Sequence, residues 1–330
     1  MSKNQKIQNF LEKEYSKIFD PNRISSYRIG DCGPPWIGAL LSHIVACTNL
    51  SYSCGYTTKL SLHSEWKMLP NGKFSDVFYL SEFEEVDDAL FDVNNFNGSN
   101  TRMSYNCRKT EGFDPHFSTK VAYFYPNGLE EIVGIDNPII LSDIWKSFLL
   151  KRVFKITPKY QNYVNQKLNK FKDLKNYAAI HIRRGDKVVG RMKESNYIET
   201  KKYFESLESS NYSFEHIFIS TDSPDALAES ISLYGSKYNL VYDEDETRHD
   251  GYPLKVVDGL LDINQTSHEE LVTALKNFYI LKNSNVIVGT PASWFFRISM
   301  LLKDYEDIQN VIYAEDLNGI PGYPEAYYHC

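Results

Sequence analysis

The second half of the sequence alternates short apolar segments, typical of β-strands, with longer amphipathic segments, typical of helices. Strands are predicted at 177–182, 216–220, 239–242 and 285–289, with helices at about 196–207, from 224, from 271 and through 298–302. Residues 267–270 are predicted to form a capping box before the helix from 271. Because strands that alternate with helices form a parallel sheet covered on both faces, this half predicts an α/β domain of the Rossmann type. Ligands of such sheets bind at the carboxyl ends of the strands, so the residues after each strand are the candidate site.

The first half of the sequence carries a less regular pattern. Apolar residues recur at helical spacing from Ile37 to Val45, and 57–62 is typical of a strand. Residues 82–118 are acidic and then Asn-rich, which predicts a long irregular excursion. Asp143 is predicted to cap a helix, and Thr157-Pro158 begins another, since proline suits the first turn.

The length of the chain predicts two domains. Its 330 residues, 42% of them hydrophobic, exceed what one core usually holds. The boundary is expected between Phe154 and Tyr177. We therefore predict an N-terminal α/β domain at 1–155 and a C-terminal Rossmann-type domain at 156–330.

Composition argues against several classes of protein. The net charge of -7 and the lack of a basic stripe predict that nucleic acid is not a partner. The five cysteines are odd in number and form no CxxC pair, so we expect free thiols rather than a zinc site or a disulfide framework. The polar N-terminus lacks a signal-peptide core and no segment of about twenty apolar residues occurs, so a cytoplasmic location without stable membrane insertion is expected.

The most informative cluster follows the strand at 177–182. Arg183, Arg184 and Lys187 place three cations within five residues, which suits a diphosphate, since arginine binds phosphate oxygens bidentately and lysine adds a point charge. Asp186 can orient an arginine, and Gly185 permits a sharp turn. A solvated turn with surface ion pairs is the alternative, and the position at a strand end favours function.

Two further clusters follow other predicted strands. Ser293, after Thr290, stands where a helix begins, and helix N-termini favour phosphate. An ordinary N-cap serine is an equally good interpretation. Thr221-Asp222 can likewise be a simple turn and cap. The three clusters are expected to converge at one edge of the sheet.

Other motifs point elsewhere. Asp243-Glu244-Asp245 resembles the DxD that holds a divalent metal in many sugar transferases, but its acidic surroundings favour a surface loop, so no metal is predicted. His43 is interpreted as a core histidine. The sequence contains no Gly-X-Ser-X-Gly, Walker loop, GxGxxG or HExxH, which gives hydrolases, NTPases and nicotinamide enzymes no support.

The segment from His181 to Val188 resembles the H-x-R-R-T-D-K-V signature of the α1,6-fucosyltransferases, which core-fucosylate N-glycans and are related to the bacterial Nod-factor fucosyltransferases. Further segments resemble that family in the same order along the chain. They are Gly30 to Cys47, Leu62 to Trp66, Ile144 to Arg152, Ile219 to Pro224 and Val286 to Leu302.

The resemblance implies two α/β domains of GT-B-like form, inversion at the anomeric carbon, no metal, and GDP-fucose on the C-terminal domain. It implies that Arg183 holds the β-phosphate, that His181 and Ser293 lie against GDP, and that Lys187 acts near the departing phosphate. Preplaced cations of this kind stabilise the charge that develops on a leaving group. Asp186 is predicted to be one of the catalytic residues. The residues predicted to bind the nucleotide sugar are His181, Arg183, Arg184, Asp222, Asn277, Thr290 and Ser293.

The sequence departs from the family in two places. A glutamate proposed as the family's base falls at Arg191, and the nearest acid is Glu194, which becomes the candidate base. The family's nucleotide-binding aspartate falls near Asn277, which supplies no charge and weakens the case for guanine selectivity. The membrane anchor, stem and SH3 domain of the animal enzymes are expected to be absent.

The sequence thus predicts an inverting, metal-independent transferase that moves fucose from GDP-fucose to a glycan. Its partners would be a nucleotide sugar and a glycan acceptor. Two alternatives stay open: a transferase that uses another GDP-sugar, and a non-catalytic glycan-binding protein on the same fold.

Overall fold

The chain divides into two compact units, the first ending at Thr157 and the second beginning at Pro158. This computed structural model describes residues 2–17, 26–29, 37–53, 57–60, 69, 72, 74–79, 102–103, 124–189, 193 and 196–314. Glu194, Arg191, the side chain of His43 and most of the predicted excursion at 82–118 lie outside these residues. No described helix combines the length and the apolar character needed to cross a membrane.

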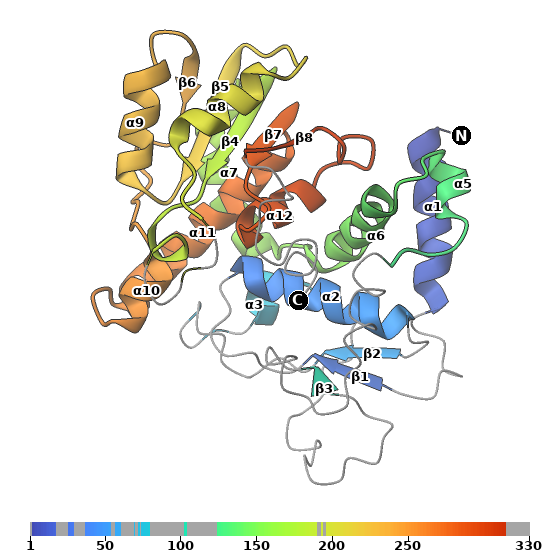
Figure 1. Cartoon of the computed structure of the whole chain (residues 1–330). Helices are drawn as coiled ribbons and strands as arrows, with labels where there is room; N and C mark the ends of the chain where they lie inside the picture. The colour runs from blue at the N-terminus through green and yellow to red at the C-terminus, as the bar shows by residue number, and fades with distance from the viewer. Residues whose placement is uncertain are drawn as a thin grey trace. The chain divides into compact units, whose positions relative to one another are not determined.

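The first unit contains a small parallel sheet and several helices (Figure 1). The strands lie in the order β2-β1-β3. The elements are α1 (Lys3–Ser16), β1 (Ser26–Ile29), α2 (Ile37–Ser53), β2 (Thr57–Leu60), α3 (Phe74–Val77), β3 (Arg102–Met103), α5 (Leu129–Val133) and α6 (Pro138–Val153). Helix α2 packs against α6, where the buried Trp145 indole donates to Asn49 Oδ1 at 2.9 Å.

The predicted start of α6 was wrong. Asp143 lies buried inside the helix, and the N-cap is Asn137, whose Oδ1 accepts from the amides of Ile139 and Ile140 at 3.0 and 3.3 Å. Asn137 supplies the side-chain acceptor and Pro138 the preset first turn, so the helix begins a turn and a half before the aspartate. Strand β1 and the short β3 were not predicted.

The second unit is a five-stranded parallel sheet between two layers of helices (Figure 1). Its strands lie in the order β6-β5-β4-β7-β8. They are β4 (Tyr177–Ile182), β5 (His216–Thr221), β6 (Asn239–Val241), β7 (Val286–Gly289) and β8 (Val311–Tyr313). The helices are α7 (Pro158–Leu168), α8 (Thr200–Glu208), α9 (Pro224–Tyr234), α10 (Tyr252–Val257), α11 (Ile263–Lys282) and α12 (Trp294–Leu301), with short 3-10 turns η4 (Asn169–Phe171) and η5 (Gly185–Lys187).

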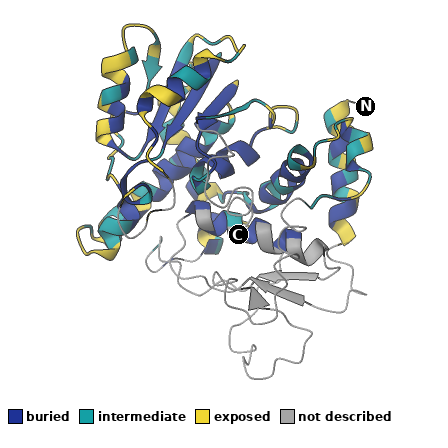
Figure 2. Ribbon diagram, in the orientation of Figure 1, coloured by how far each residue is buried: buried dark blue, intermediate teal, exposed yellow. Residues whose placement is uncertain are grey.

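Both faces of the central strands are covered. Ala178, Ile180 and Ile182 of β4 pack with residues of α8 and α9, whereas Tyr177 and Ala179 pack with residues of α11 and α12. Figure 2 shows the central strands buried throughout. This double coverage explains why β4 and β7 read as continuous apolar runs rather than as alternating ones.

Two helix starts in this unit differ from the prediction. Helix α11 begins at Ile263, capped by Asp262, so Ser267 lies within the helix and is not the cap of a capping box. Helix α8 begins at Thr200 rather than near residue 196. Strand β8 was not predicted, because its three residues carry too short a pattern.

The order of the strands reverses at β4. From β4 the chain goes to β5 and β6 on one side, then crosses to β7 and β8 on the other. In open parallel sheets such a reversal leaves a crevice between the two strands that flank it, and ligands bind there. The carboxyl ends of β4 and β7 therefore define the place where a ligand would sit.

Candidate functional site

A hydrogen-bonded line of side chains crosses the carboxyl end of the sheet. His181 near the end of β4 places Nε2 3.2 Å from Ser293 Oγ and Nδ1 3.4 Å from Ser220 Oγ on β5. Ser293 is also the N-cap of α12 and accepts from the amide of Phe296 at 3.4 Å. The predicted convergence of the strand ends is confirmed here, and it joins residues 112 positions apart.

His181 is held neutral. It is 5% exposed, and its ring stacks on Phe295 with the centroids 5.0 Å apart. Burial, helped by the nearby Arg183 cation, lowers the pKa of His181 from 6.5 to about 3. A neutral imidazole can donate from one nitrogen and accept at the other, so it joins the two serine hydroxyls without adding charge.

Arg183 is fixed by two carboxylates. One guanidinium nitrogen donates to Asp186 Oδ1 at 2.8 Å, and the other binds Asp222 Oδ2. Asp222 also accepts from the backbone amide of Arg184 at 3.0 Å, so its two oxygens tie the end of β5 to the end of β4. The Arg183 side chain is 14% exposed. It is therefore anchored on one side and still reachable from the crevice.

Two glycines allow a second loop to close over this turn. Gly185 has φ +60°, and a Cβ there would lie 2.6 Å from the backbone nitrogen of Gly251. Gly251 has φ +101°, and its Cβ would lie 2.8 Å from the nitrogen of Asp186. The amide of Asp250 donates to the carbonyl of Asp222 at 2.8 Å. A side chain at either glycine would push the loop away from Asp186 and Asp222, the two carboxylates that anchor Arg183.

Arg184 points to different partners from Arg183. It is 5% exposed, donates to Thr200 Oγ1 at 3.2 Å, and its guanidinium carbon lies 4.0 Å from the centre of the Tyr197 ring. Its Nη1 has no hydrogen-bond partner among the described residues. Lys187 is half-buried at the end of η5. Thr290, which follows β7, is buried and accepts from the amide of Ala292 at 3.3 Å.

Asn277 belongs to a buried ionic cluster on α11. Its Nδ2 lies 3.2 and 3.3 Å from the two carboxylate oxygens of Glu246, while the neighbouring Lys276 donates to Glu246 at 3.0 Å and to Asp243 at 2.7 Å. A carboxylate only accepts hydrogen bonds, so the amide orientation is fixed and Oδ1 faces away from Glu246. That Oδ1 is buried and has no hydrogen-bond partner among the described residues.

The same cluster corrects the interpretation of the DxD segment as a surface loop at one residue, Asp243. Asp243 is 3% exposed and holds the fully buried Lys276, whereas Glu244 and Asp245 are exposed and Asp245 binds Lys170. Within the described part of the chain, no three His, Cys, Asp or Glu side chains form a group that could hold a metal ion.

Sequence reasoning missed one acidic residue at this site, Glu270 on α11. Its Oε2 lies 4.0 Å from His249 Nε2. Burial and the nearby Glu246 raise the pKa of Glu270 to about 8, against an opposing effect of Arg183. The sequence interpretation assigned this glutamate to a capping box, which hid the alternative that it faces the loop at 249–251.

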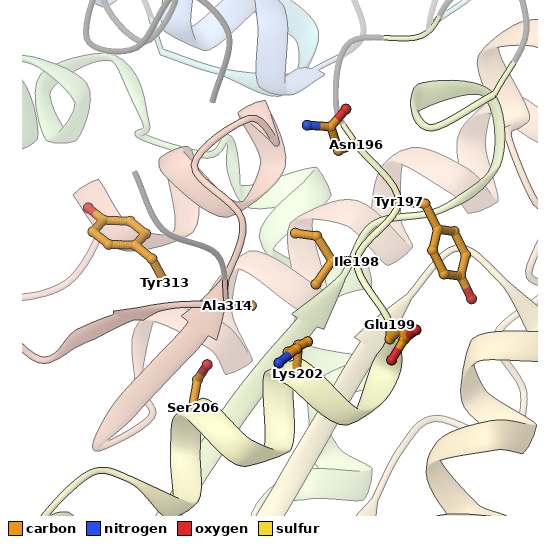
Figure 3. Close-up of a pocket in the computed structure, with 8 residues that line it drawn as sticks. All are labelled: Asn196, Tyr197, Ile198, Glu199, Lys202, Ser206, Tyr313 and Ala314. Atoms are coloured by element: carbon orange, nitrogen blue, oxygen red, sulfur yellow. The ribbon is translucent and has the colours of Figure 1, made fainter. Parts of the chain in front are cut away.

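A separate groove of about 680 Å³ opens beside α8 (Figure 3). Its lining residues come from the segment before α8, from α8 and from the end of β8. They are Asn196, Tyr197, Ile198, Glu199, Lys202, Ser206, Tyr313 and Ala314. Tyr197 and Tyr313 lie at opposite ends of the group, with Ile198 between them (Figure 3). None of the described residues that the sequence predicted for the site lines this groove.

The described site residues thus fall into two groups. His181, Arg183, Asp222 and Ser293 meet at the strand ends, whereas Asn277 lies with Glu246 on α11. Together they offer an anchored cation and the N-terminus of α12, both of which favour a bound anion.

Comparisons by sequence and by structure give different results. No protein-family profile and no curated protein sequence matches the chain. Solved structures do match. A GDP complex of a mutant of FUT1 from Arabidopsis thaliana has a TM-score of 0.51 at 10% identity, over 92% of this chain and 77% of the other. The fucosyltransferase NodZ from Bradyrhizobium gives 0.47 at 12% identity, over 84% and 93%. POFUT1 in complex with GDP-fucose gives 0.44 at 8% identity, over 89% and 98%.

The likeness to plant FUT1 concerns the fold. It extends over most of this chain, at an identity too low to carry residue roles from one protein to the other. The predicted fold class is confirmed: the protein is α/β, with a parallel sheet flanked by helices, in a GT-B-like fold that it shares with plant FUT1.

Proposed function

We propose that the protein is an inverting, metal-independent glycosyltransferase that moves fucose from GDP-fucose to a hydroxyl of a glycan acceptor. The observation that carries the proposal is the meeting of two anion-binding features at the reversal of the sheet. Arg183 follows β4 and Ser293 begins α12 after β7, and His181 connects the two strand ends. A diphosphate in the crevice between β4 and β7 would reach both features.

Each predicted residue has a role in the proposed reaction. Arg183, preset by Asp186 and Asp222, would hold the β-phosphate, and Lys187 would stabilise the charge on the departing GDP. The acceptor oxygen bonds to the anomeric carbon of fucose while the bond to the β-phosphate oxygen breaks, and GDP leaves with the electron pair. The acceptor proton passes to a general base, for which Glu194 is the candidate.

The remaining predicted residues would bind the nucleotide. The buried amide oxygen of Asn277 has no hydrogen-bond partner among the described residues, and it would accept a hydrogen bond from a nucleobase that offers an N–H group. Arg184 and Thr290 are expected to support the turn and the helix start that flank the diphosphate. We assign the acceptor to the N-terminal domain, residues 1–155, and the nucleotide sugar to residues 156–330.

Metal independence is part of the proposal. The DxD aspartate that is buried, Asp243, already binds the ammonium group of Lys276. A divalent ion at Asp243 would have to displace the fully buried ammonium group of Lys276. Transfer is therefore expected to persist in EDTA, and a strict requirement for added Mg²⁺ or Mn²⁺ would refute this part.

The whole proposal is tested with a panel of nucleotide sugars. GDP-fucose, GDP-mannose and UDP-glucose are screened by thermal shift, and GDP release is then followed with and without glycan acceptors. Of the three nucleotide sugars, we expect only GDP-fucose to stabilise the protein and to be cleaved with release of GDP. Turnover of GDP-mannose instead would identify the transferase that uses another GDP-sugar. Glycan binding without any GDP release would identify the non-catalytic protein.

A further inference from the structure

The Glu270 side chain on α11 is mostly buried and faces another loop of the protein, which is unusual for a glutamate. It lies on α11 seven residues before Asn277, which places the two side chains about two turns apart on one face of the helix. Its side chain is 28% exposed, and its Oε2 lies 4.0 Å from His249 Nε2. The side chain is thus mostly covered but keeps some exposed surface.

The loop that carries His249 connects Glu270 to the Arg183 anchors. Asp250 donates its amide to the carbonyl of Asp222, and Gly251 packs against the backbone of Asp186. Asp222 and Asp186 are the two carboxylates that hold Arg183. The two residues that follow His249 each lie against one of the two anchors of the guanidinium, and the charge of Arg183 acts on Glu270, so Glu270 lies on the Arg183 side of α11.

The charges around Glu270 favour its neutral form. Burial, Glu246 and Glu269 disfavour the carboxylate, while Arg183 and Lys276 favour it, and the balance raises the pKa of Glu270 to about 8. His249 adds no compensating cation, because burial, helped by the nearby Lys255 cation, lowers its pKa and keeps its ring neutral. The Tyr252 hydroxyl, which also faces Glu270, is uncharged and binds Thr266.

We propose that Glu270 is a further donor-binding residue, whose protonated carboxyl donates a hydrogen bond to the diphosphate that Arg183 holds. The proposal rests on the proposed function, because it takes the ligand at Arg183 to be a nucleotide diphosphate. An ionised carboxylate beside a diphosphate would repel it, whereas a neutral carboxyl offers an O–H donor. Proteins do keep carboxyl groups neutral for this purpose in apolar surroundings.

A consequence of this arrangement is that nucleotide-sugar binding and protonation of Glu270 are coupled. Binding selects the protonated side chain, so affinity is full below the pKa of Glu270 and declines as the pH rises through it. Above the pKa of Glu270 the apparent Kd rises about tenfold per pH unit, and below it the Kd is nearly constant. Because this pKa is about 8, the Kd should rise about tenfold between pH 7 and pH 9.

The test measures the Kd of GDP-fucose by calorimetry from about pH 7 to about pH 9 in the wild-type protein and in two variants. Glu270→Gln keeps a neutral hydrogen-bond donor and removes the titrating group. Glu269→Gln is the matched control, because it changes the neighbouring and more exposed glutamate of the same helix. We expect the wild-type protein and Glu269→Gln to lose affinity about tenfold over this range, and Glu270→Gln to bind with a constant Kd close to the wild-type value at pH 7.

The outcomes separate this inference from the proposed function. Binding of GDP-fucose with the same pH dependence in Glu270→Gln and the wild-type protein would overturn the role of Glu270 and leave the transferase proposal intact. A wild-type Kd that is constant over the range would do the same. Absence of GDP-fucose binding at every pH would overturn both proposals.

Discussion

His181 Nε2 lies 3.2 Å from Ser293 Oγ, so the end of strand β4 is joined directly to the N-cap of α12. The contact spans the point where the strand order reverses, between β4 and β7. A histidine with two serine partners and an aromatic ring over its face is rigid and uncharged. It joins the start of α12 to the end of β4, two residues before Arg183, and leaves the positive charge to the guanidinium.

The buried His181 makes the stability of the protein sensitive to acid. Its folded pKa of about 3 lies below the ordinary value of 6.5, so the unfolded chain binds a proton first as the pH falls. The stability that the neutral ring contributes is complete above about pH 6.5 and is lost towards pH 3. Compared with His181→Gln, the wild-type protein should lose about 2 kcal/mol more of its unfolding free energy between pH 7 and pH 5.

Urea unfolding at the two pH values measures this difference. The other seven of the eight histidines are present in both proteins and cancel in the comparison. Equal pH dependence in wild-type and variant would show that the imidazole takes up a proton while folded.

Arg183 is expected to be the residue on which donor binding depends most. Arg183→Ala removes the guanidinium that Asp186 and Asp222 preset, and GDP release from GDP-fucose should fall by on the order of a hundredfold or more. Arg183→Lys keeps the charge but loses the planar fork, so it should recover only part of the activity. Steady-state kinetics with thermal melts separates this effect from unfolding, and near-normal turnover in a folded Arg183→Ala protein would reject the site.

The strand ends of the second unit could be predicted because each rests on a local signal. The apolar run at 177–182 is β4 without change, and parallel strands must bring Arg183, Asp222 and Ser293 to one edge. Helix starts were less predictable, because several local caps compete. Asp143 and Ser267 are good N-caps by type, but Asn137 and Asp262 lie further upstream and start the helices first.

The environment of α11 could not be predicted, because it depends on how one loop packs. Glu246 and Glu270 contact residues of α11 and of the loop at 249–251, and this loop lies against η5 because Gly251 closely approaches the backbone of Asp186. That approach needs left-handed backbone at both Gly185 and Gly251, a condition that links positions 66 residues apart and leaves no trace in local periodicity.

The buried Lys276 should be essential for stability. It is fully buried between Asp243 and Glu246, which are 3% and 8% exposed. Removing one partner of a buried ion pair leaves an uncompensated charge, so Lys276→Met should cost about 3–5 kcal/mol of unfolding free energy. Lys167→Met removes a pair with the more exposed Glu269 and should cost less than about 1 kcal/mol.

Denaturant unfolding of the two lysine variants checks this contrast. The triple variant Lys276→Met, Asp243→Asn and Glu246→Gln removes the stranded charges and should recover part of the loss. Equal costs for Lys276→Met and Lys167→Met would mean that the buried cluster is not an ion pair in solution.

Ser293 has two roles that a matched serine can separate. As the N-cap of α12 it binds the amide of Phe296, and as the partner of His181 it lies at the proposed diphosphate site. Ser223 is the N-cap of α9 and binds the amide of Ala226 at the same distance, 3.4 Å, without contacting His181. Ser293→Ala and Ser223→Ala should therefore each cost about 1 kcal/mol of stability, while only Ser293→Ala weakens GDP-fucose binding, by roughly tenfold. Calorimetric Kd values and urea midpoints on both variants decide the matter, because equal affinities would confine Ser293 to the cap.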